Sequence, residues 1–311
     1  MTHVLRWGRS SYETDADMAA ERAGVEALGG SWSLVEDRIR PPVGLDRADV
    51  LVVNSKVRVT DAVLAGFGGC CVLTTTSGHD HVDVDAARRR GVTVGRSPRA
   101  RRDAVVEHAV GAMIGLMRAQ PLFAAAARDG RWARPELPRI APRGLSGATV
   151  VVVGLGVIGQ HMTRALQAFG AQVRGVDPAI AGAWALDDAL AGADAVTLHC
   201  ALTPTSRGLM DATRLATLGS HAVVVNTARG ECLDLDAAVD AVAHGRLRGV
   251  AADVFSIEPY PRLAAQAVVP GVWLSPHSAG FTHDLGSRVA AEVIASVDEW
   301  VATGTVPAKV A

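Results

Sequence analysis

The strongest constraint on the fold is a glycine-rich turn in the middle of the chain. Residues 149–153 read TVVVV, an apolar run typical of a buried strand, and Gly154, Gly156 and Gly159 follow it where helical spacing begins. In such a unit Gly154 permits the tight turn, Gly156 lets a pyrophosphate approach the backbone, and Gly159 lets the helix pack against the strand. The pattern predicts a dinucleotide-binding strand–turn–helix unit.

An acidic residue at the end of the next expected strand, residues 172–176, completes this pattern. Asp177 lies 21 residues beyond Gly156, where a carboxylate can accept hydrogen bonds from both ribose hydroxyls and would repel a 2′-phosphate. The amides of Val157 and Ile158 open the helix, whose N-terminus favours an anion such as the pyrophosphate. The pattern therefore predicts NAD as the cofactor, in preference to NADP.

The position of the turn implies a second domain. About 150 residues precede it, which is enough for a complete domain, and with 311 residues, 49% of them apolar, the chain can fill two hydrophobic cores. In the first hundred residues strands alternate with helices: the strand-like runs are 4–7, 50–54, 71–75 and 92–94, and the helical patterns are 16–28, 61–67 and 84–90. Such alternation predicts a parallel sheet with helices on its faces.

The middle of the chain carries a long apolar helix, expected at 104–119, and an arginine- and proline-rich stretch, 128–143, expected to be an extended arm or linker. Beyond the glycine turn the alternation resumes, with strands at 195–199, 222–226, 249–253 and 272–274 and helices at 157–169, 234–244 and 286–300. The predicted fold class is α/β, with two doubly wound parallel-sheet domains.

Charge and composition exclude several classes of function. The formal net charge is −1, so there is no basic field that would attract nucleic acid. The first residues lack the pattern of a signal peptide, and no apolar run reaches the eighteen or so residues that cross a membrane. The cysteines lack metal-site spacing and are expected to be small buried side chains in a cytoplasmic protein: Cys70, Cys71, Cys200 and Cys232.

Three polar segments stand at the ends of expected strands, at the edge where open parallel sheets bind ligands: residues 226–230, 253–259 and 275–280. Reduction of a 2-oxo acid needs a cation for the carboxylate and carbonyl, which the fork of Arg229 suits. It also needs a proton donor beside the nascent alkoxide, which suits His277 with Glu258 as the carboxylate that orients it. The alternative is that His277 and Glu258 are ordinary turn residues next to Pro276 and Pro259.

The motifs in these segments and elsewhere form an ordered set. The set reads TSGHDHVDVDAARRRGV (76–92), AVVEHAVG (104–111), GLGVIG (154–159), LHCALTPTSRGLM (198–210), NTARGECLD (226–234), DVFSIEPYP (253–261) and SPHSAG (275–280). Between about Asp49 and Gly304 the chain resembles the D-isomer-specific 2-hydroxyacid dehydrogenase family, a family of NAD-dependent oxidoreductases. The resemblance implies hydride transfer between nicotinamide and C2 of a D-2-hydroxy acid or 2-oxo acid.

The same resemblance implies roles for individual residues. Arg229 would bind the substrate carboxylate and carbonyl, His277 would be the acid–base group, and Glu258 would be its partner. Ser77 and Gly78 would donate backbone N–H groups to the substrate carboxylate. The nicotinamide end of the cofactor site would be lined by Thr227, Ala228 and Asp253, and Gly280 would also bind the cofactor. The implied fold is a flavodoxin-like substrate domain, residues 1–98 plus 285–311, with an inserted Rossmann domain, residues 99–284, usually as a homodimer.

Two departures from the family bear on the substrate. Phosphoglycerate-type enzymes usually carry arginine at the position of Asn54 and asparagine at that of Arg101, which here lies in an arginine-rich stretch expected to be a loop between the domains. If both positions border one pocket, the pocket keeps an arginine, but on the opposite side from that in phosphoglycerate-type enzymes. This predicts a substrate with a second polar or anionic group beyond C3. Two other functions on this fold remain open, a cofactor-sensing corepressor and a phosphite-type dehydrogenase. No metal site is expected at His79-Asp80-His81.

Overall fold

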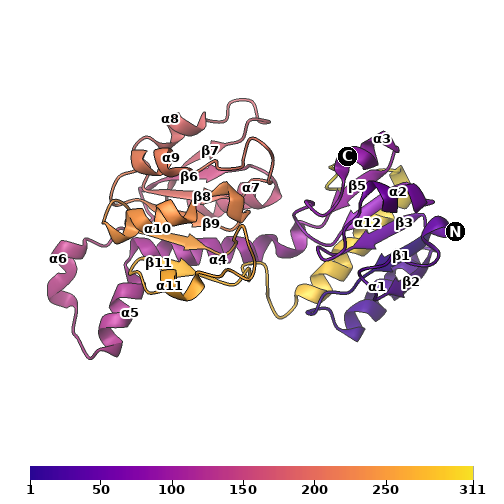
Figure 1. Ribbon diagram of the computed structural model, residues 1–311, viewed down its shortest axis with the longest axis horizontal. Coiled ribbons are helices and arrows are strands. Elements are labelled where there is room, and N and C mark those ends of the chain that lie inside the picture. Colours follow the sequence, from indigo (N-terminus) through magenta and orange to yellow (C-terminus); the bar gives the residue numbers. More distant parts are fainter. Residues whose placement is uncertain (311) are drawn as a thin grey trace. The chain divides into compact units, whose positions relative to one another are not determined.

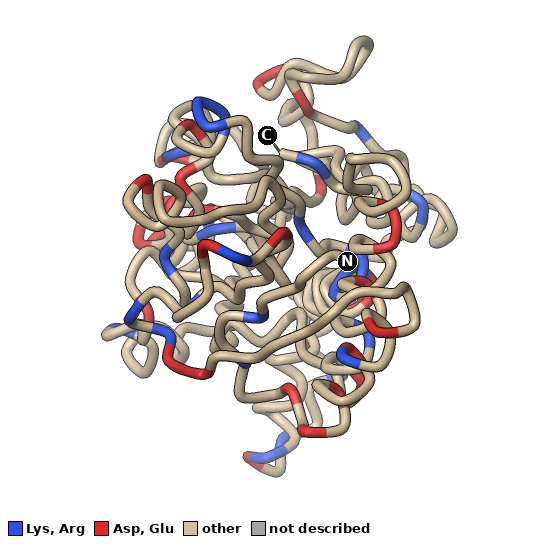
Figure 2. Tube along the Cα trace, turned by 90° about the vertical axis from the view of Figure 1, so that its right-hand side faces the viewer, with Lys and Arg blue, Asp and Glu red and all other residues tan. Residues whose placement is uncertain are grey.

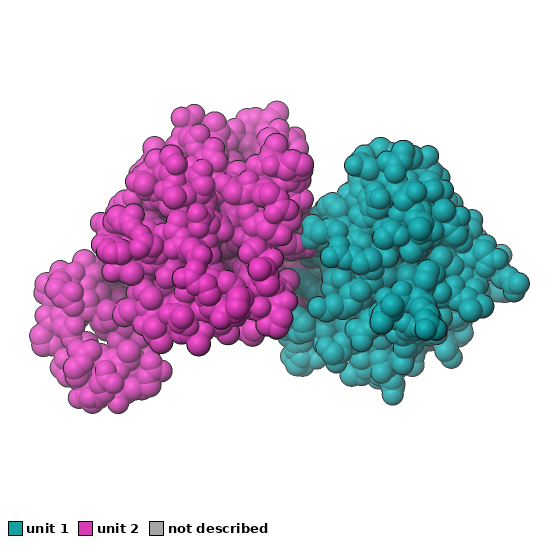
Figure 3. All heavy atoms as spheres, in the orientation of Figure 1, with its two compact units in different colours: residues 1–101, 281–311 teal, residues 102–280 magenta. Residues whose placement is uncertain are grey.

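The computed structural model describes residues 1–310, which form two compact units, coloured separately in Figure 3. Unit 1 is Met1–Arg101 with Phe281–Ala311, and unit 2 is Arg102–Gly280. The chain crosses between the units after Arg101 and after Gly280, whereas the domains implied by the resemblance have these crossings after residues 98 and 284. The second crossing comes earlier because Phe281 packs edge-to-face on Tyr12 of unit 1, with the ring centroids 5.2 Å apart.

Unit 1 is built on a five-stranded parallel sheet with the order β2-β1-β3-β4-β5. Its strands are β1 (His3–Trp7), β2 (Ser31–Val35), β3 (Val50–Val53), β4 (Cys71–Thr74) and β5 (Thr93–Arg96). Strand β2 was not predicted, because in SWSLV apolar and polar residues mix on an edge strand that is buried only at Trp32. In this order the chain reverses direction between β1 and β3, the switch point where flavodoxin-like sheets bind ligands.

Helices cover both faces of this sheet (Figure 1). One face packs against α1 (Asp15–Ala27) and α12 (Leu285–Thr303), which lie so close that a Cβ on Gly24 would come within 2.4 Å of Ile294. The other face is covered by α2 (Asp61–Gly66) and α3 (Val84–Arg89). The last helix of the chain therefore completes the core of the first domain, as the resemblance implied.

Unit 2 is built on a six-stranded parallel sheet with the order β11-β10-β9-β8-β6-β7. Its strands are β6 (Thr149–Val153), β7 (Gln172–Val176), β8 (Ala195–Leu198), β9 (Val223–Asn226), β10 (Gly249–Ala252) and β11 (Val272–Leu274). One face packs against α4 (Arg99–Met117) and α7 (Val157–Ala168), and the other packs mainly against α8 (Leu186–Leu190), α9 (Ala212–Thr217) and α10 (Leu235–Ala243). The α/β fold with two parallel sheets is confirmed.

Helix α4 begins at Arg99, five residues before the start that its apolar pattern predicted, so Arg101 lies in its first turn and not in a loop. The start is set by Glu292 of α12, whose carboxylate accepts hydrogen bonds from the amides of Arg99 (3.0 Å) and Ala100 (2.6 Å). This capping carboxylate lies about 190 residues away in sequence. Local patterning could not reveal it.

The stretch expected to be an extended arm is partly helical. It follows α5 (Gln120–Arg128) and contains a 3-10 turn, Arg134–Glu136, and α6 (Leu137–Ile140). None of the residues of that turn or of α6 is buried, and Trp132 between α5 and the turn is 81% exposed.

No single helix among residues 1–310 is long and apolar enough to cross a membrane. The pair α4 and α5 reaches that threshold only together, with a bend of 67° between them, and α4 is packed into the core of unit 2. Basic and acidic residues are both distributed over the chain (Figure 2), in line with the net charge of −1. Of the cysteines, Cys71 and Cys232 are buried, but Cys70 is exposed, contrary to expectation, because it lies in the bend before β4 and not in the strand.

Candidate active site

The glycine turn after β6 has the geometry that the sequence predicted. Gly154 has a φ of +89°, which L side chains rarely adopt. A Cβ on Gly159 would lie 1.8 Å from the carbonyl oxygen of Gly154, so only glycine lets α7 start this close to the turn. Gly156 precedes α7 with no side-chain cap, and the first amides of the helix are therefore available to an anion.

Asp177 lies where its carboxylate can accept hydrogen bonds from the ribose of the cofactor. Its Oδ2 accepts a hydrogen bond from the amide of Leu155 inside the glycine turn (2.8 Å), and its Oδ1 accepts one from the amide of Ala179 (3.0 Å). These contacts hold the carboxylate at the mouth of the turn, and each oxygen has a second lone pair for a ribose hydroxyl. The open turn, the uncapped helix and this carboxylate fit NAD.

A buried histidine lies beside the same turn. His199 follows β8, and its Nε2 is 2.9 Å from Oγ1 of Thr197, while its Nδ1 is 3.4 Å from Oγ1 of Thr227. Burial lowers the pKa of His199 to about 4. The ring is therefore neutral at physiological pH, and it links the ends of β8 and β9 beside the cofactor turn.

The loop that carries Arg229 is held by hydrogen bonds from one of its own side chains. The side chain of Asn226, the last residue of β9, donates to the carbonyl of Arg229 (2.9 Å) and accepts from the amide of Ala228 (3.0 Å). Nη1 of Arg229 donates to the carbonyl of Ala228 (2.7 Å), and the guanidinium is only partly exposed. Asn226, which the sequence did not single out as a functional residue, thus sets the conformation of this loop.

The structure brings His277 and Glu258 together. Nδ1 of His277 lies 2.8 Å from Oε2 and 3.0 Å from Oε1 of Glu258, and Oε1 also accepts a hydrogen bond from the amide of Phe255 (3.1 Å). Because Nδ1 faces the carboxylate, Nε2 is the ring nitrogen that can serve a substrate. The loop of Arg229 packs against this segment: a Cβ on Gly230 would lie 2.0 Å from the carbonyl carbon of Phe255.

Asp253 holds the loop that presents His277. Its Oδ1 accepts from the amide of Ser278 (2.8 Å) and from Oγ of Ser275 (2.6 Å), and its Oδ2 accepts from the amide of Ala279 (2.8 Å). The carbonyl of Asp253 accepts the amide of His277 (2.8 Å), which has a φ of +54°. The structure thus gives Asp253 a supporting role that the resemblance, which assigned it to the nicotinamide end, did not mention.

In unit 1 the residues predicted to bind the substrate carboxylate lie in the loop after β4. The carbonyl of Thr76 accepts the amide of Ser97 (3.1 Å), that of Ser77 accepts Nη1 of Arg96 (3.3 Å), and that of Gly78 accepts Oγ1 of Thr76 (2.8 Å). The amides of Ser77 and Gly78 donate to no other residue in the described part of the chain. Two free amides beside engaged carbonyls form a backbone site for an anion.

Asn54 and Arg101 also lie at the carboxyl edge of the unit 1 sheet. Oδ1 of Asn54 accepts from the amide of Lys56 (2.9 Å), whereas its buried Nδ2 has no partner among the described residues. Arg101 donates to the carbonyl of Thr75 and to the hydroxyl of Tyr12, over whose ring its guanidinium lies. No carboxylate oxygen within the described residues comes within 4 Å of it.

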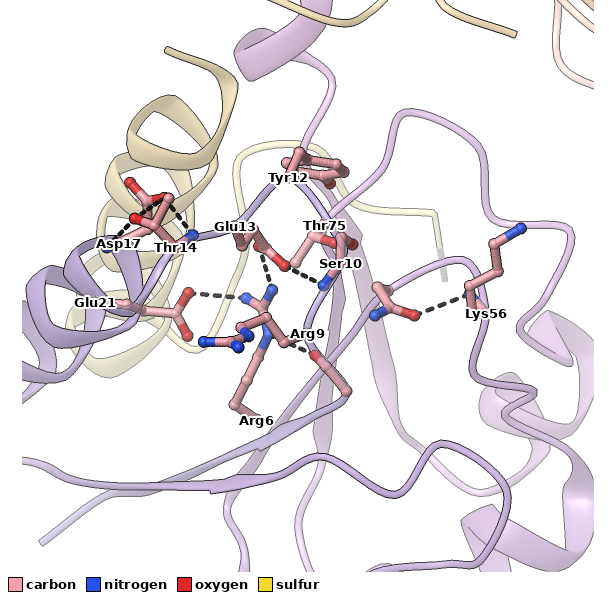
Figure 4. Close-up of polar contacts among 12 residues, drawn as sticks. Arg6, Arg9, Ser10, Tyr12, Glu13, Thr14, Asp17, Glu21, Lys56 and Thr75 are labelled. Carbon is pink, nitrogen blue, oxygen red and sulfur yellow. Dashed lines mark hydrogen bonds and ion pairs between the residues drawn. The ribbon is translucent and has the colours of Figure 1, made fainter. Parts of the chain in front are cut away.

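The loop after β1, which carries Tyr12, is anchored by three buried charged residues, Arg6, Glu13 and Glu21 (Figure 4). Arg6 lies between Glu13 and Glu21, and all three side chains are fully buried. Glu13 in turn accepts the amide of Ser10 (2.6 Å), and Arg6 donates to the carbonyl of Gly8 (3.1 Å). Burial raises the pKa of Glu21, although Arg6 opposes the shift. No group of three possible metal ligands occurs among residues 1–310.

Comparison with known proteins identifies the family of the chain. The family model for the NAD binding domain of D-isomer specific 2-hydroxyacid dehydrogenases matches residues 110–279. D-3-phosphoglycerate dehydrogenase of Mycobacterium bovis is 34% identical over 290 residues, which is 88% of this chain and 54% of that protein. Hydroxypyruvate reductase of Thermotoga maritima is 28% identical over 262 residues, 81% of this chain and 85% of that protein. The chain thus spans about half the length of the D-3-phosphoglycerate dehydrogenases that it matches.

Solved structures share the fold along the whole chain. D-lactate dehydrogenase from Aquifex aeolicus, complexed with NAD and lactic acid, superimposes with a TM-score of 0.79 at 22% identity and covers 96% of this chain and 95% of its own. An acyclic imino acid reductase with NADPH and D-Arg reaches a TM-score of 0.83 at 18% identity over both full chains. The chain belongs to the D-isomer specific 2-hydroxyacid dehydrogenase family, and its unit 2 carries the NAD-binding domain of that family.

Proposed function

We propose that the protein is an NAD-dependent dehydrogenase that transfers hydride between nicotinamide and C2 of a D-2-hydroxy acid or its 2-oxo acid. The observation that carries this proposal is the pairing of His277 with Glu258 at 2.8 Å. A carboxylate on Nδ1 orients the imidazole and stabilises its protonated form. Such a pair can donate a proton to a nascent alkoxide and take it back in the reverse direction.

Each residue of the site has a distinct task in reduction. Bound NADH supplies the hydride. Arg229 offers its guanidinium to the carboxylate and the C2 oxygen, where the charge orients the substrate and stabilises negative charge on that oxygen. His277 gives the proton from Nε2, and the carboxylate of Glu258 orients the ring and balances the imidazolium. The amides of Ser77 and Gly78 bind the substrate carboxylate.

We propose further that the substrate carries a second polar or anionic group beyond C3. Arg101 supports this, because its guanidinium binds a carbonyl and a hydroxyl and has no carboxylate within 4 Å among the described residues. The relatives named D-3-phosphoglycerate dehydrogenase and hydroxypyruvate reductase point the same way, because phosphohydroxypyruvate and hydroxypyruvate both have an oxygen on C3.

The test is turnover of NADH with a panel of 2-oxo acids: glyoxylate, pyruvate, hydroxypyruvate, longer alkyl acids, and phosphorylated and dicarboxylic ones. The chirality of the product is determined for every acid except glyoxylate, whose product glycolate is achiral. We expect a D-hydroxy acid from each of the other acids that is reduced and the highest kcat/KM for an acid with a polar C3 substituent or a second anionic group. No turnover with any 2-oxo acid would contradict the enzymatic proposal. Preference for an alkyl acid would contradict only the proposal about the second group.

We also propose that the protein is a homodimer and that the arm after α5, which includes Trp132 and α6, contributes to the interface. The support is the exposure of Trp132 (81%) and Leu137 (39%) on a segment with few buried residues, since large exposed apolar side chains are enriched at protein interfaces. Light scattering should give twice the chain mass. Trp132→Arg should shift the protein towards the monomer, whereas the exposed Phe169→Arg should not.

A further inference from the structure

One arginine in unit 1 is unexplained by the roles assigned above. Arg96 is the last residue of β5, and its side chain is partly buried. Its Nη1 donates to the carbonyl of Ser77 (3.3 Å), while its Nε has no partner among the described residues. Within that part of the chain no carboxylate lies within 4 Å of it. Burial lowers the pKa of Arg96, which means that the surroundings do not compensate its charge.

A buried cation without a counter-ion costs free energy. Arg6 on β1 of the same sheet differs from Arg96 in this respect, because it is buried between the carboxylates of Glu13 and Glu21. The chain therefore neutralises a buried structural arginine of this sheet with two carboxylates, and it does not do so for Arg96. An uncompensated guanidinium beside a backbone anion site indicates a role in binding the anion.

The geometry of the peptide that Arg96 contacts defines that role. The peptide between Ser77 and Gly78 is trans, and in a trans peptide the carbonyl and the N–H point in opposite directions. Because Arg96 binds the carbonyl of Ser77, the N–H of Gly78 is directed away from Arg96. The neighbouring peptide is fixed in the same manner, since the carbonyl of Thr76 accepts the amide of Ser97, which leaves the N–H of Ser77 free on the opposite side.

We propose that Arg96 is a positioning residue for the substrate carboxylate. It holds the peptide between Ser77 and Gly78 with the amide of Gly78 turned towards the ligand, and its positive charge behind the carbonyl polarises that peptide. A hydrogen bond at the carbonyl strengthens the N–H of the same peptide as a donor. The charge also attracts the anion through the peptide. Arg96 therefore acts on binding and touches no reacting atom. This inference rests on the proposed function only in that the ligand is a 2-oxo carboxylate.

The test compares a carboxylate with its neutral ester. The variants are Arg96→Met, which removes the hydrogen bond and the charge, and Arg96→Lys, which keeps the charge. Arg88→Met on α3 is the control, because Arg88 is exposed and, among the described residues, forms its ion pair with Asp85 of its own helix. For each protein kcat and KM are measured with pyruvate and with methyl pyruvate, together with the Kd for NADH and the melting temperature.

We expect Arg96→Met to raise KM for pyruvate about tenfold, the effect of one hydrogen bond to a charged group. The kcat, the KM for methyl pyruvate and the Kd for NADH should stay within about twofold of wild type. Arg96→Lys should fall between wild type and Arg96→Met. An equal rise in KM for the acid and the ester would show a merely structural role and overturn the inference, as would an unchanged KM for pyruvate.

A second measurement separates this inference from the proposed function. Oxamate is an analogue of pyruvate that keeps the carboxylate. Its binding to the complex of the protein with NADH is measured by calorimetry, which needs no turnover. Wild type that binds oxamate but reduces no 2-oxo acid would contradict the proposed function alone. An Arg96→Met variant that binds oxamate as tightly as wild type would overturn the role of Arg96. Wild type that neither binds oxamate nor reduces a 2-oxo acid would overturn both.

Discussion

Glu258 contacts His277 through Nδ1, with 2.8 Å between that nitrogen and Oε2, and this contact leaves Nε2 for the substrate. We expect His277→Gln to lower kcat for reduction by about 10²- to 10⁴-fold, the usual share of general acid catalysis. Stopped-flow measurement of NADH oxidation at saturating substrate checks this. A loss below tenfold would mean that another group supplies the proton.

The partner of this histidine should control the pH dependence of reduction. Glu258→Gln removes the carboxylate that faces Nδ1 and balances the charge of the imidazolium, so activity in reduction should fall off at a lower pH than in wild type. The loss of kcat at the optimum should be smaller than in His277→Gln. The profile of kcat against pH is compared for the two proteins, and superimposable profiles would refute a functional contact between the residues.

The carboxylate of Asp177 should exclude the 2′-phosphate of NADPH. In Asp177→Asn the amide oxygen can still accept from Leu155 or Ala179, so the turn is kept, while the negative charge is lost. We expect the preference of wild type for NADH over NADPH, measured as the ratio of kcat/KM, to shrink about 10- to 100-fold. Wild type that uses NADPH as well as NADH would contradict the interpretation of Asp177.

Close packing at Gly159 makes the cofactor turn intolerant of a single methyl group. In Gly159→Ala the Cβ would lie 1.8 Å from the carbonyl oxygen of Gly154, whereas in Gly111→Ala on α4 it would meet nothing within 4 Å. We expect Gly159→Ala to weaken NADH binding at least about 30-fold. Gly111→Ala should bind NADH normally and gain about 0.5–1 kcal/mol of stability, as expected for alanine in a helix. Fluorescence titration with NADH and urea unfolding provide the two readouts.

His199 should destabilise the protein in mild acid. Burial lowers its pKa to about 4 from the ordinary 6.5, so between these values the unfolded chain binds a proton that the folded chain does not. The free energy of unfolding is therefore lost as the pH falls from 6.5 towards 4, by about 1–2 kcal/mol between pH 7 and pH 5. His199→Asn should lose correspondingly less over the same interval in urea unfolding, and equal losses would show that His199 ionises freely in the fold.

Arg101 should matter for a substrate with a distal anionic group and little for glyoxylate. An arginine enclosed with an anion contributes about 2–5 kcal/mol, compared with less than about 1 kcal/mol at an exposed site. Arg101→Ala also removes the bonds to Thr75 and Tyr12, so Tyr12→Phe, which removes only the hydroxyl, is the control for the loop. A rise in KM of at least about 30-fold for a phosphorylated or dicarboxylic 2-oxo acid, with a small change for glyoxylate, is expected. Equal rises for both substrates would assign Arg101 a structural role.

The sequence by itself determined the fold class and the cofactor turn, because both depend on local physical requirements. Gly154 must adopt a positive φ, Gly159 must lack a Cβ, and the TVVVV strand must be buried on both faces, so each requirement leaves a residue type that can be read from the chain. The motifs around Arg229, Glu258 and His277 likewise stand at strand ends, and the parallel register brings those ends to one edge of the sheet.

Tertiary structure alone decided what holds these residues in place. The start of α4 depends on Glu292, the loop of His277 on Asp253, the loop of Arg229 on Asn226, and the peptide of Gly78 on Arg96. The contact of Asn226 spans only 3 residues, but the others join segments that lie 19, 25 and 192 residues apart in the sequence. A side chain whose task is to satisfy one particular carbonyl or amide has no periodicity and no fixed spacing, because its position depends on which strands pair. For that reason the motifs predicted the chemistry of the site, whereas the side chains that hold its residues in place could not be predicted.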